Sequence, residues 1–160
     1  MHRGALRPRV VVDVKALPGM GDIVYERQRG LTLGAAVTMN EVARHPDVRA
    51  LYPLLAESAR SVASYQIRNR ATVGGNLCNA SPCADCAPAA LGLGSELVVY
   101  GPAGERRIPC SGFFLGPGKT ALEPDELLTA IHFPPPPPRA AARYLKLGRN
   151  KAGDLSLVGV

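Results

Sequence analysis

Residues 66–82 of this 160-residue chain read QIRNRATVGGNLCNASP, and this polar stretch decides how the rest of the sequence is interpreted. The slightly longer segment 64–82 is rich in Asn, Gly, Ser and Thr, which predicts a loop. At its centre, the TVGGN segment at 72–76 places two glycines side by side, and such a pair lets a ligand approach the backbone and contact successive amides. The segment has neither the Lys-Ser/Thr ending of a phosphate-binding loop nor the glycine spacing of a dinucleotide fingerprint. From these residues alone it is a turn or a nucleotide-binding loop.

Upstream of this stretch, the sequence alternates between short strands and helices. The β-branched run at 9–14 predicts a buried strand, and 23–26 with 31–37 predict a strand pair. Thr38 and Glu41 have the spacing of a capping box, which predicts a short helix that ends near residue 45. Apolar residues at helical spacing predict a second helix over residues 47–63.

Downstream, one helix is followed mainly by strands. The predicted elements are a helix at 85–93 with Asp85 at its amino end, a hairpin of 96–100 and 105–109 joined by a turn at 101–104, and strands at 127–133, 143–147 and 155–160. Five prolines at 134–138 form a stiff segment that is typical of a linker. This mixture of helices and strands predicts an α+β fold.

The net charge of +6 invites a nucleic-acid interpretation, but the arginines are spread along the whole chain rather than gathered on one helix. No helix-turn-helix, zinc-finger or stacking-aromatic pattern accompanies them. A solvated surface with one anion-binding cleft explains the charge better, and a dinucleotide's pyrophosphate is an anion that fits it. The sequence has no apolar run long enough for a membrane span and no secretory leader, so we expect a cytoplasmic chain.

Segment 66–82 resembles the second flavin loop of the FAD-binding (medium) subunits of molybdopterin dehydrogenases. Further matches follow in the same order as in that family: 84–85, 112–120, 124–128, 144–146 and 151–154. The Ile-Arg-Asn at 67–69, the Gly-Pro-Gly-Lys at 116–119 and the Ile-His-Phe-Pro at 131–134 are most similar to the FAD-binding subunit of bacterial xanthine dehydrogenases.

The resemblance implies a fold of two α/β subdomains that together bind FAD, followed by a C-terminal domain. We therefore expect a FAD-binding domain at 1–134, a proline linker at 135–139 and the beginning of the C-terminal domain at 140–160. The family's first glycine-rich loop, similar to Ala-Gly-Gly-x-Ser, precedes the segment that corresponds to 9–14. Because Met1 comes after that point, we expect the chain to be incomplete at both ends and to bind FAD weakly in isolation.

The resemblance also assigns cofactor contacts, and each has an ordinary structural alternative. The residues implied to contact FAD are Thr72, Val73, Gly74, Gly75, Asn76, Asp85, Leu128 and Lys146. In this assignment the 72–76 segment gives amides and a hydroxyl to the phosphate and ribityl region, Leu128 packs against a ring, and Lys146 places a cation near the cofactor. The alternatives are that Asp85 is only a helix cap, Leu128 only a core residue and Lys146 only a solvated lysine.

The function implied by the resemblance is electron transfer through FAD in a molybdenum hydroxylase. Electrons from a large molybdenum-cofactor subunit reach FAD through the [2Fe–2S] clusters of a small subunit and pass to NAD or another acceptor. The substrate is chosen on the molybdenum subunit, so this chain leaves it open. An alternative function is a non-catalytic module that only docks onto partner subunits.

Four cysteines suggest another alternative, an iron–sulfur electron carrier. Cys78, Cys83 and Cys86 have the spacing of a plant-type [2Fe–2S] site, with Cys110 further along the chain. The glycine-rich sequence that surrounds such clusters is absent between them, so we expect free or buried thiols and no metal. The three histidines have no metal-ligand spacing, and no set of residues predicts nucleophilic catalysis.

Overall fold

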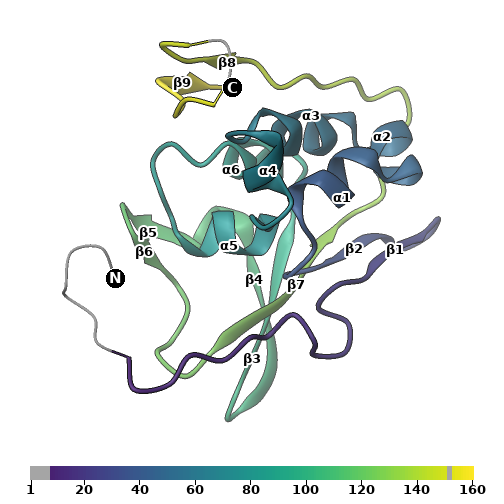
Figure 1. Cartoon of the computed structure of the whole chain (residues 1–160). Helices are drawn as coiled ribbons and strands as arrows, with labels where there is room; N and C mark the ends of the chain where they lie inside the picture. Colours follow the sequence, from purple (N-terminus) through teal and green to yellow (C-terminus); the bar gives the residue numbers. More distant parts are fainter. Residues whose placement is uncertain (1–7, 151–152) are drawn as a thin grey trace.

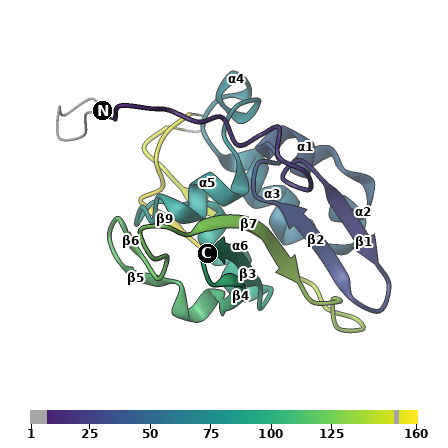
Figure 2. The same cartoon turned by 90° about the horizontal axis from the view of Figure 1, so that it is seen from below.

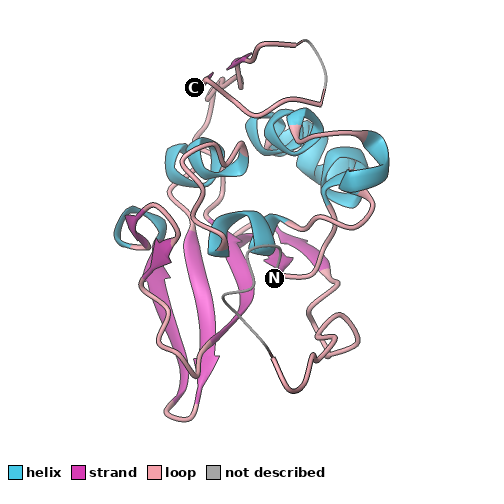
Figure 3. Cartoon of the chain, turned by 60° about the vertical axis from the view of Figure 1, so that its left-hand side comes forward, coloured by secondary structure: helices cyan, strands magenta, loops and turns pink. Residues whose placement is uncertain are grey.

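A five-stranded antiparallel sheet lies at the centre of the computed structural model, which describes residues 8–150 and 153–160. Its strands lie in the order β1-β2-β7-β3-β4. Their bounds are β1 (Ile23–Glu26), β2 (Gly30–Gly34), β3 (Glu96–Gly101), β4 (Gly104–Pro109) and β7 (Leu127–Phe133). The larger helices gather on one side of this sheet (Figures 1 and 3). The α+β class expected from the sequence is confirmed.

The sheet has one apolar face because successive side chains of a strand point to opposite sides. Leu33 on β2 pairs with Ile131 on β7, which pairs in turn with Leu97 on β3, and all three side chains are fully buried. Thr32 and His132 pair one position along and point to the other face. The core therefore lies between the apolar face and the helices that cover it.

Three of the helices begin at a side-chain hydroxyl. The bounds are α1 (Met39–Arg44), α2 (Pro46–Leu51), α3 (Pro53–Ser61), α4 (Tyr65–Arg68), α5 (Val73–Cys78) and α6 (Cys86–Gly92), with a 3₁₀ turn at η1 (Cys110–Gly112). The capping box predicted before α1 is confirmed, with both of its reciprocal hydrogen bonds formed. Ser64 and Thr72 likewise accept hydrogen bonds from the amides of Ile67 and Gly75, and so begin α4 and α5.

The single helix predicted over 47–63 is wrong, and so is the loop predicted over 64–82. The first divides into α2 and α3 at Tyr52, because Pro53 has no amide to continue α2 and is suited to the first position of a new helix. The second contains α4 and α5. Its many Asn, Gly and Ser residues suggested a loop, but hydroxyl caps are sufficient to begin two short helices there.

The buried strand predicted at residues 9–14 is also wrong. Val10, Val11 and Val12 are each about three-quarters exposed. The segment follows an irregular path and is drawn as a tube without a strand arrow (Figure 2), and no strand among the described residues pairs with it. A β-branched run gives strand propensity, but a strand forms only where a partner supplies hydrogen bonds and burial.

Most of the other predicted strands are present. The β3–β4 hairpin is confirmed, and Gly104 in its turn adopts a φ of +97°, a conformation that favours glycine. β7 has the predicted bounds. A small ribbon joins β5 (Phe114–Gly116) and β6 (Lys119–Thr120).

Near the C-terminus, the strands predicted at 143–147 and 155–160 shorten to β8 (Lys146–Leu147) and β9 (Val158–Gly159). They form a ribbon beyond α3 and α6, away from the sheet (Figure 1). The proline segment that leads to it is anchored at its start, since the Tyr52 hydroxyl donates to the Pro134 carbonyl at 3.1 Å. The division into domains at 134 and 140 stays a prediction. No helix within residues 8–150 and 153–160 has the length and apolar character of a membrane span.

Candidate functional site

The TVGGN segment forms the first turn of α5. It packs directly on Ala35, in the turn that follows β2. Thr72 is the cap, and its Oγ1 accepts a hydrogen bond from the Gly75 amide at 2.9 Å. A Cβ on Gly74 would lie 2.5 Å from the Ala35 carbonyl oxygen, well inside contact distance. Gly74 is therefore required for this close approach of two backbones. The sequence suggested that a glycine was needed here, but it did not identify Ala35 as the neighbour that requires it.

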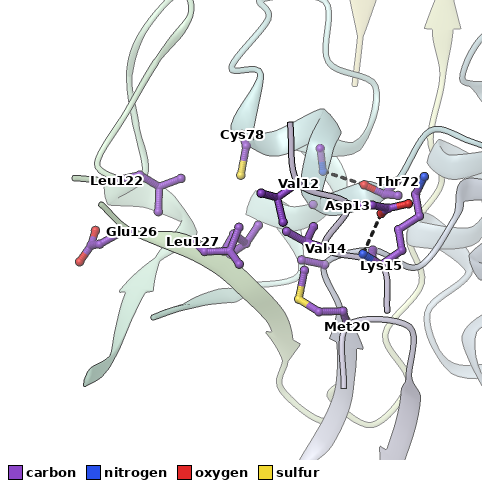
Figure 4. Close-up of a pocket in the computed structure, with 15 residues that line it drawn as sticks. Val12, Asp13, Val14, Lys15, Met20, Thr72, Cys78, Leu122, Glu126 and Leu127 are labelled. Carbon is purple, nitrogen blue, oxygen red and sulfur yellow. Dashed lines mark hydrogen bonds between the residues drawn. The ribbon is translucent and has the colours of Figure 1, made fainter. Parts of the chain in front are cut away.

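Beside this turn lies a cavity of about 370 Å³, whose walls come from four separate parts of the chain. Residues 12–15 and Met20 form one side (Figure 4), and residues 35–36 and the start of α5 also line the cavity. The wall opposite consists of Leu122, Glu126, Leu127 and Leu128. Most of these side chains are apolar, so the cavity suits a flat ring better than a fully hydrated group.

Charged groups border the cavity at two ends. On one side the Lys15 amide donates to the Asp13 carboxylate at 3.0 Å, and the Lys15 side chain extends toward Thr72 (Figure 4). On the other, Glu126 is held by Arg106 through two hydrogen bonds of 2.6 Å. These bonds, together with one from the Glu123 amide, lower the pKa of Glu126 to about 2, so it is ionised at neutral pH. Lys15 is the cation in the cavity lining.

Four residues of the predicted site meet at this cavity, namely Thr72, Gly74, Gly75 and Leu128. Val73 is instead fully buried in the core beneath α5. Asn76 borders a neighbouring hollow together with Thr72 and Gly75, and its side-chain oxygen accepts from the Cys86 amide at 3.2 Å. That hydrogen bond joins α5 to the beginning of α6.

Asp85 and Lys146 lie together outside the cavity lining, in a buried polar cluster. Asp85 makes no side-chain cap for α6, although the sequence suggested one. One of its oxygens accepts from the Tyr144 hydroxyl at 2.8 Å and from Ser156, and the other accepts from the Lys146 ammonium at 2.9 Å. Burial, and then the hydrogen bond to Asp85, raise the pKa of Tyr144 to about 12. The cluster anchors the C-terminal ribbon.

The cysteines do not assemble into a metal site. No group of three or more His, Cys, Asp or Glu within residues 8–150 and 153–160 has an arrangement that could hold a metal ion. All four cysteines are free thiols. Burial raises the pKa of Cys78 to about 11 and that of Cys86 to about 12, so both thiols are protonated at neutral pH. Cys78 borders the cavity, while Cys86 contacts the Met39 sulfur at 3.6 Å.

Sequence reasoning missed a large part of the cavity. The residues of its lining that were not singled out for the site are Val12, Asp13, Val14, Lys15, Met20, Ala35, Ala36, Cys78, Leu122, Glu126 and Leu127. Val12, Asp13 and Val14 belong to the run at 9–14 that was predicted as a buried strand. Glu126 and Leu127 were visible only as members of the 124–128 match.

Comparison with known proteins finds one family that matches most of the chain. Residues 1–136 match the model of the family described as the FAD binding domain in molybdopterin dehydrogenase. The chain is 36% identical over 160 residues to the xanthine dehydrogenase FAD-binding subunit of Escherichia coli O157:H7, covering 99% of this chain and 55% of that protein. It is 35% identical to the carbon monoxide dehydrogenase medium chain of Hydrogenophaga pseudoflava, covering 96% of this chain and 53% of the other.

Solved structures resemble it equally well. The quinoline 2-oxidoreductase of Pseudomonas putida 86 superposes with a TM-score of 0.91 at 28% identity, covering 99% of this chain and 54% of that one. The carbon monoxide dehydrogenase of Hydrogenophaga pseudoflava gives a TM-score of 0.84 at 34% identity, covering 92% and 50%. The chain therefore spans about half the length of these relatives.

Proposed function

Because the chain belongs to the family of FAD-binding domains of molybdopterin dehydrogenases, we propose that it binds FAD and that the cavity beside α5 is part of the cofactor site. The observation that carries the proposal is the position of Gly74. Its closeness to Ala35 places the α5 turn at the edge of an apolar cavity. As the second residue of its helix, Gly74 has no intrahelical acceptor for its amide.

The residues present fit the cofactor. FAD contains flat rings, which suit the apolar walls of the cavity, and sugar and ribityl hydroxyls, to which the Asp13 carboxylate and the Thr72 hydroxyl can hydrogen-bond. Lys15 is the cation of the lining, and the Glu126 carboxylate is paired with Arg106. A volume of about 370 Å³ is suited to one ring system with its sugar rather than the whole dinucleotide. In this arrangement Leu128 and Met20 contact the ring, Thr72 donates its hydroxyl hydrogen, and residues 12–15 limit the access of water.

Asp85, Asn76 and Lys146 remain in the proposed cofactor-binding set on the strength of the family motif. Both carboxylate oxygens of Asp85 have partners in the structure. Among the described residues its Oδ2 accepts only from Lys146, so a further donor from the cofactor could share that oxygen. Lys146 is 2.9 Å from Asp85, so the pair presents little net charge to a ligand. When bound, FAD supplies the redox chemistry, and the protein positions it and excludes solvent.

We further propose that the whole protein is the FAD subunit of a xanthine dehydrogenase-like oxidoreductase. The names of the relatives, an FAD-binding subunit and a medium chain, support membership of a heteromeric complex with a large molybdenum subunit and a small iron–sulfur subunit. Electrons would then pass from the [2Fe–2S] clusters through FAD to NAD or another acceptor. The four unpaired thiols are consistent with the cytoplasm as its location.

A cavity-filling variant tests the binding proposal. Ala36 borders the cavity, so Ala36→Leu should occupy it, whereas Ala103→Leu changes an exposed hairpin turn and serves as the matched control. FAD is added to each purified chain while quenching of flavin fluorescence is recorded. We expect the control to bind like the wild type and Ala36→Leu to bind about tenfold more weakly or worse, since the extra carbons clash with any ring in the cavity. Equal binding by all three chains would exclude this cavity as the site.

A further inference from the structure

The wall of the cavity that faces residues 12–15 comes partly from a loop and partly from a strand. Leu122 and Glu126 belong to the loop at 121–126, and Leu127 and Leu128 belong to the beginning of β7, which pairs with β3. A loop keeps a fixed shape only if contacts from elsewhere hold it, because its own backbone makes few repeating hydrogen bonds.

One side chain from another strand supplies those contacts. Arg106 on β4 donates to both oxygens of Glu126 at 2.6 Å and also to the Ala121 carbonyl at 2.9 Å. Glu126 in turn accepts from the Glu123 amide at 2.8 Å. A single guanidinium thus connects the two ends of the 121–126 loop, and the carboxylate ties the middle of the loop to the same point.

The packing around this pair is close. The Glu126 side chain is only 11% exposed, and its Cγ would lie 2.9 Å from a Cβ on Gly101 of β3. The carboxylate is therefore fixed by its stem as well as by its hydrogen bonds. Two-point contacts of arginine with a carboxylate also fix orientation, which a lysine at the same place would not do.

We propose that Arg106 and Glu126 are the positioning residues of the cofactor site, and that they hold the wall formed by Leu122, Leu127 and Leu128 in the shape that receives the ring of FAD. This inference rests on the proposed function for its ligand. What it says of the shape of the wall rests on the hydrogen bonds and packing described above. Arg106 does not border the cavity and acts through the loop, whereas Glu126 both borders the cavity and fixes the loop.

The neighbouring residue offers a matched control. Arg107 lies next to Arg106 on β4 and pairs with Glu96 at 3.4 Å, with both side chains nearly half exposed. Neither residue of this pair borders the cavity. Arg107→Gln therefore removes the same charge from the same strand without disturbing the wall.

The first test measures FAD affinity by quenching of flavin fluorescence in the full chain. Arg106→Gln and Glu126→Gln should each weaken binding about tenfold or more, as expected when charge-assisted hydrogen bonds are lost. Arg107→Gln should bind like the wild type. The double variant, Arg106→Gln with Glu126→Gln, should bind about as weakly as either single variant, because the two side chains act as one unit, whereas general destabilisation by two independent changes would add. Equal weakening by Arg107→Gln, or additive losses in the double variant, would overturn the proposal.

The second test needs no cofactor, so it separates this proposal from the proposed function. Hydrogen exchange of the amides at 121–128 should be about tenfold faster in Arg106→Gln than in Arg107→Gln, because the loop opens locally without its anchor. If Arg106→Gln does not fold, Arg106→Lys retains the charge without the two-point contact and should show part of this increase. Exchange that stays at the wild-type rate in these variants contradicts the proposal, whereas failure of the wild type to bind FAD contradicts only the proposed function.

Discussion

Gly74 shows how one residue links the sequence motif to the shape of the site. The sequence identifies a Gly-Gly pair but not which neighbour requires it. In the structure the requirement is specific, since a Cβ at Gly74 would meet the Ala35 carbonyl, whereas a Cβ at Gly75 would meet only the Thr72 hydroxyl at 3.0 Å. The two adjacent glycines therefore differ in how well they should tolerate alanine.

A substitution at Gly74 measures this packing directly. Gly74→Ala should lower the free energy of unfolding by about 1–3 kcal/mol, the usual range for a group forced into a filled space. Gly112→Ala is the control, because a Cβ there meets nothing within 4 Å. Urea denaturation followed by circular dichroism gives both values. Equal stability of the two variants would show that α5 does not pack on Ala35 as described.

At the scale of single residues, local rules predicted well where they depended only on neighbours in sequence. The capping box at Thr38 and the turn at Gly104 are examples. Rules failed where a distant partner decides. Asp85 was weighed as a helix cap, but its carboxylate is used by residues about 60 or 70 positions away along the chain. No residue near Asp85 in the sequence indicates which distant residues will be its partners.

At the scale of elements, the C-terminal ribbon is held by polar contacts to Asp85, and Tyr144 also packs against Leu54 and Ala89. Tyr144, Lys146 and Ser156 point inward to Asp85, whereas the leucines at 145, 147, 155 and 157 are exposed. Glu57 on α3 adds a further contact, since it accepts from the Tyr144 amide at 3.0 Å and pairs with Arg143. Attachment of the ribbon therefore depends on the charge of Asp85.

Removal of the Asp85 charge should lower the free energy of unfolding substantially. Asp85→Asn leaves the Lys146 ammonium buried without a charged partner, and breaking such a pair costs about 3–5 kcal/mol of stability. Glu96→Gln breaks the exposed pair with Arg107 and should cost under about 1 kcal/mol. Chemical denaturation of both variants supplies the comparison. A loss for Asp85→Asn no larger than that for Glu96→Gln would mean that the buried cluster does not hold the ribbon.

The elements that the sequence predicted correctly are those with strong local signals, the hairpin and β7 above all. The errors have identifiable causes. Pro53 divides a helix whose apolar spacing is continuous, and the hydroxyls of Ser64 and Thr72 begin helices within a glycine-rich stretch. The run at residues 9–14 has strand propensity but no partner strand among the described residues. Spacing alone contains none of this information.

At the scale of the whole molecule, the site exists because the fold brings four distant segments to one cavity. Residues 12–15, 35–36, 72–78 and 122–128 meet there, although more than a hundred residues separate the first from the last. The family motif located the third of these segments and Leu128. It could not locate Lys15 or Leu122, because their proximity depends on the path of the chain between them.

Protection of Cys78 by FAD tests the central claim most directly. Cys78 borders the cavity and Cys83 does not, so the two thiols report on occupied and unoccupied surfaces of one molecule. Because the pKa of Cys78 is raised to about 11, alkylation is measured at alkaline pH by mass spectrometry. We predict that saturating FAD slows labelling of Cys78 about tenfold, since a ligand covers most of the lining of the cavity that it fills, and leaves Cys83 unchanged. Labelling of Cys78 at an unaltered rate while FAD is bound would contradict the assignment of this cavity to the cofactor.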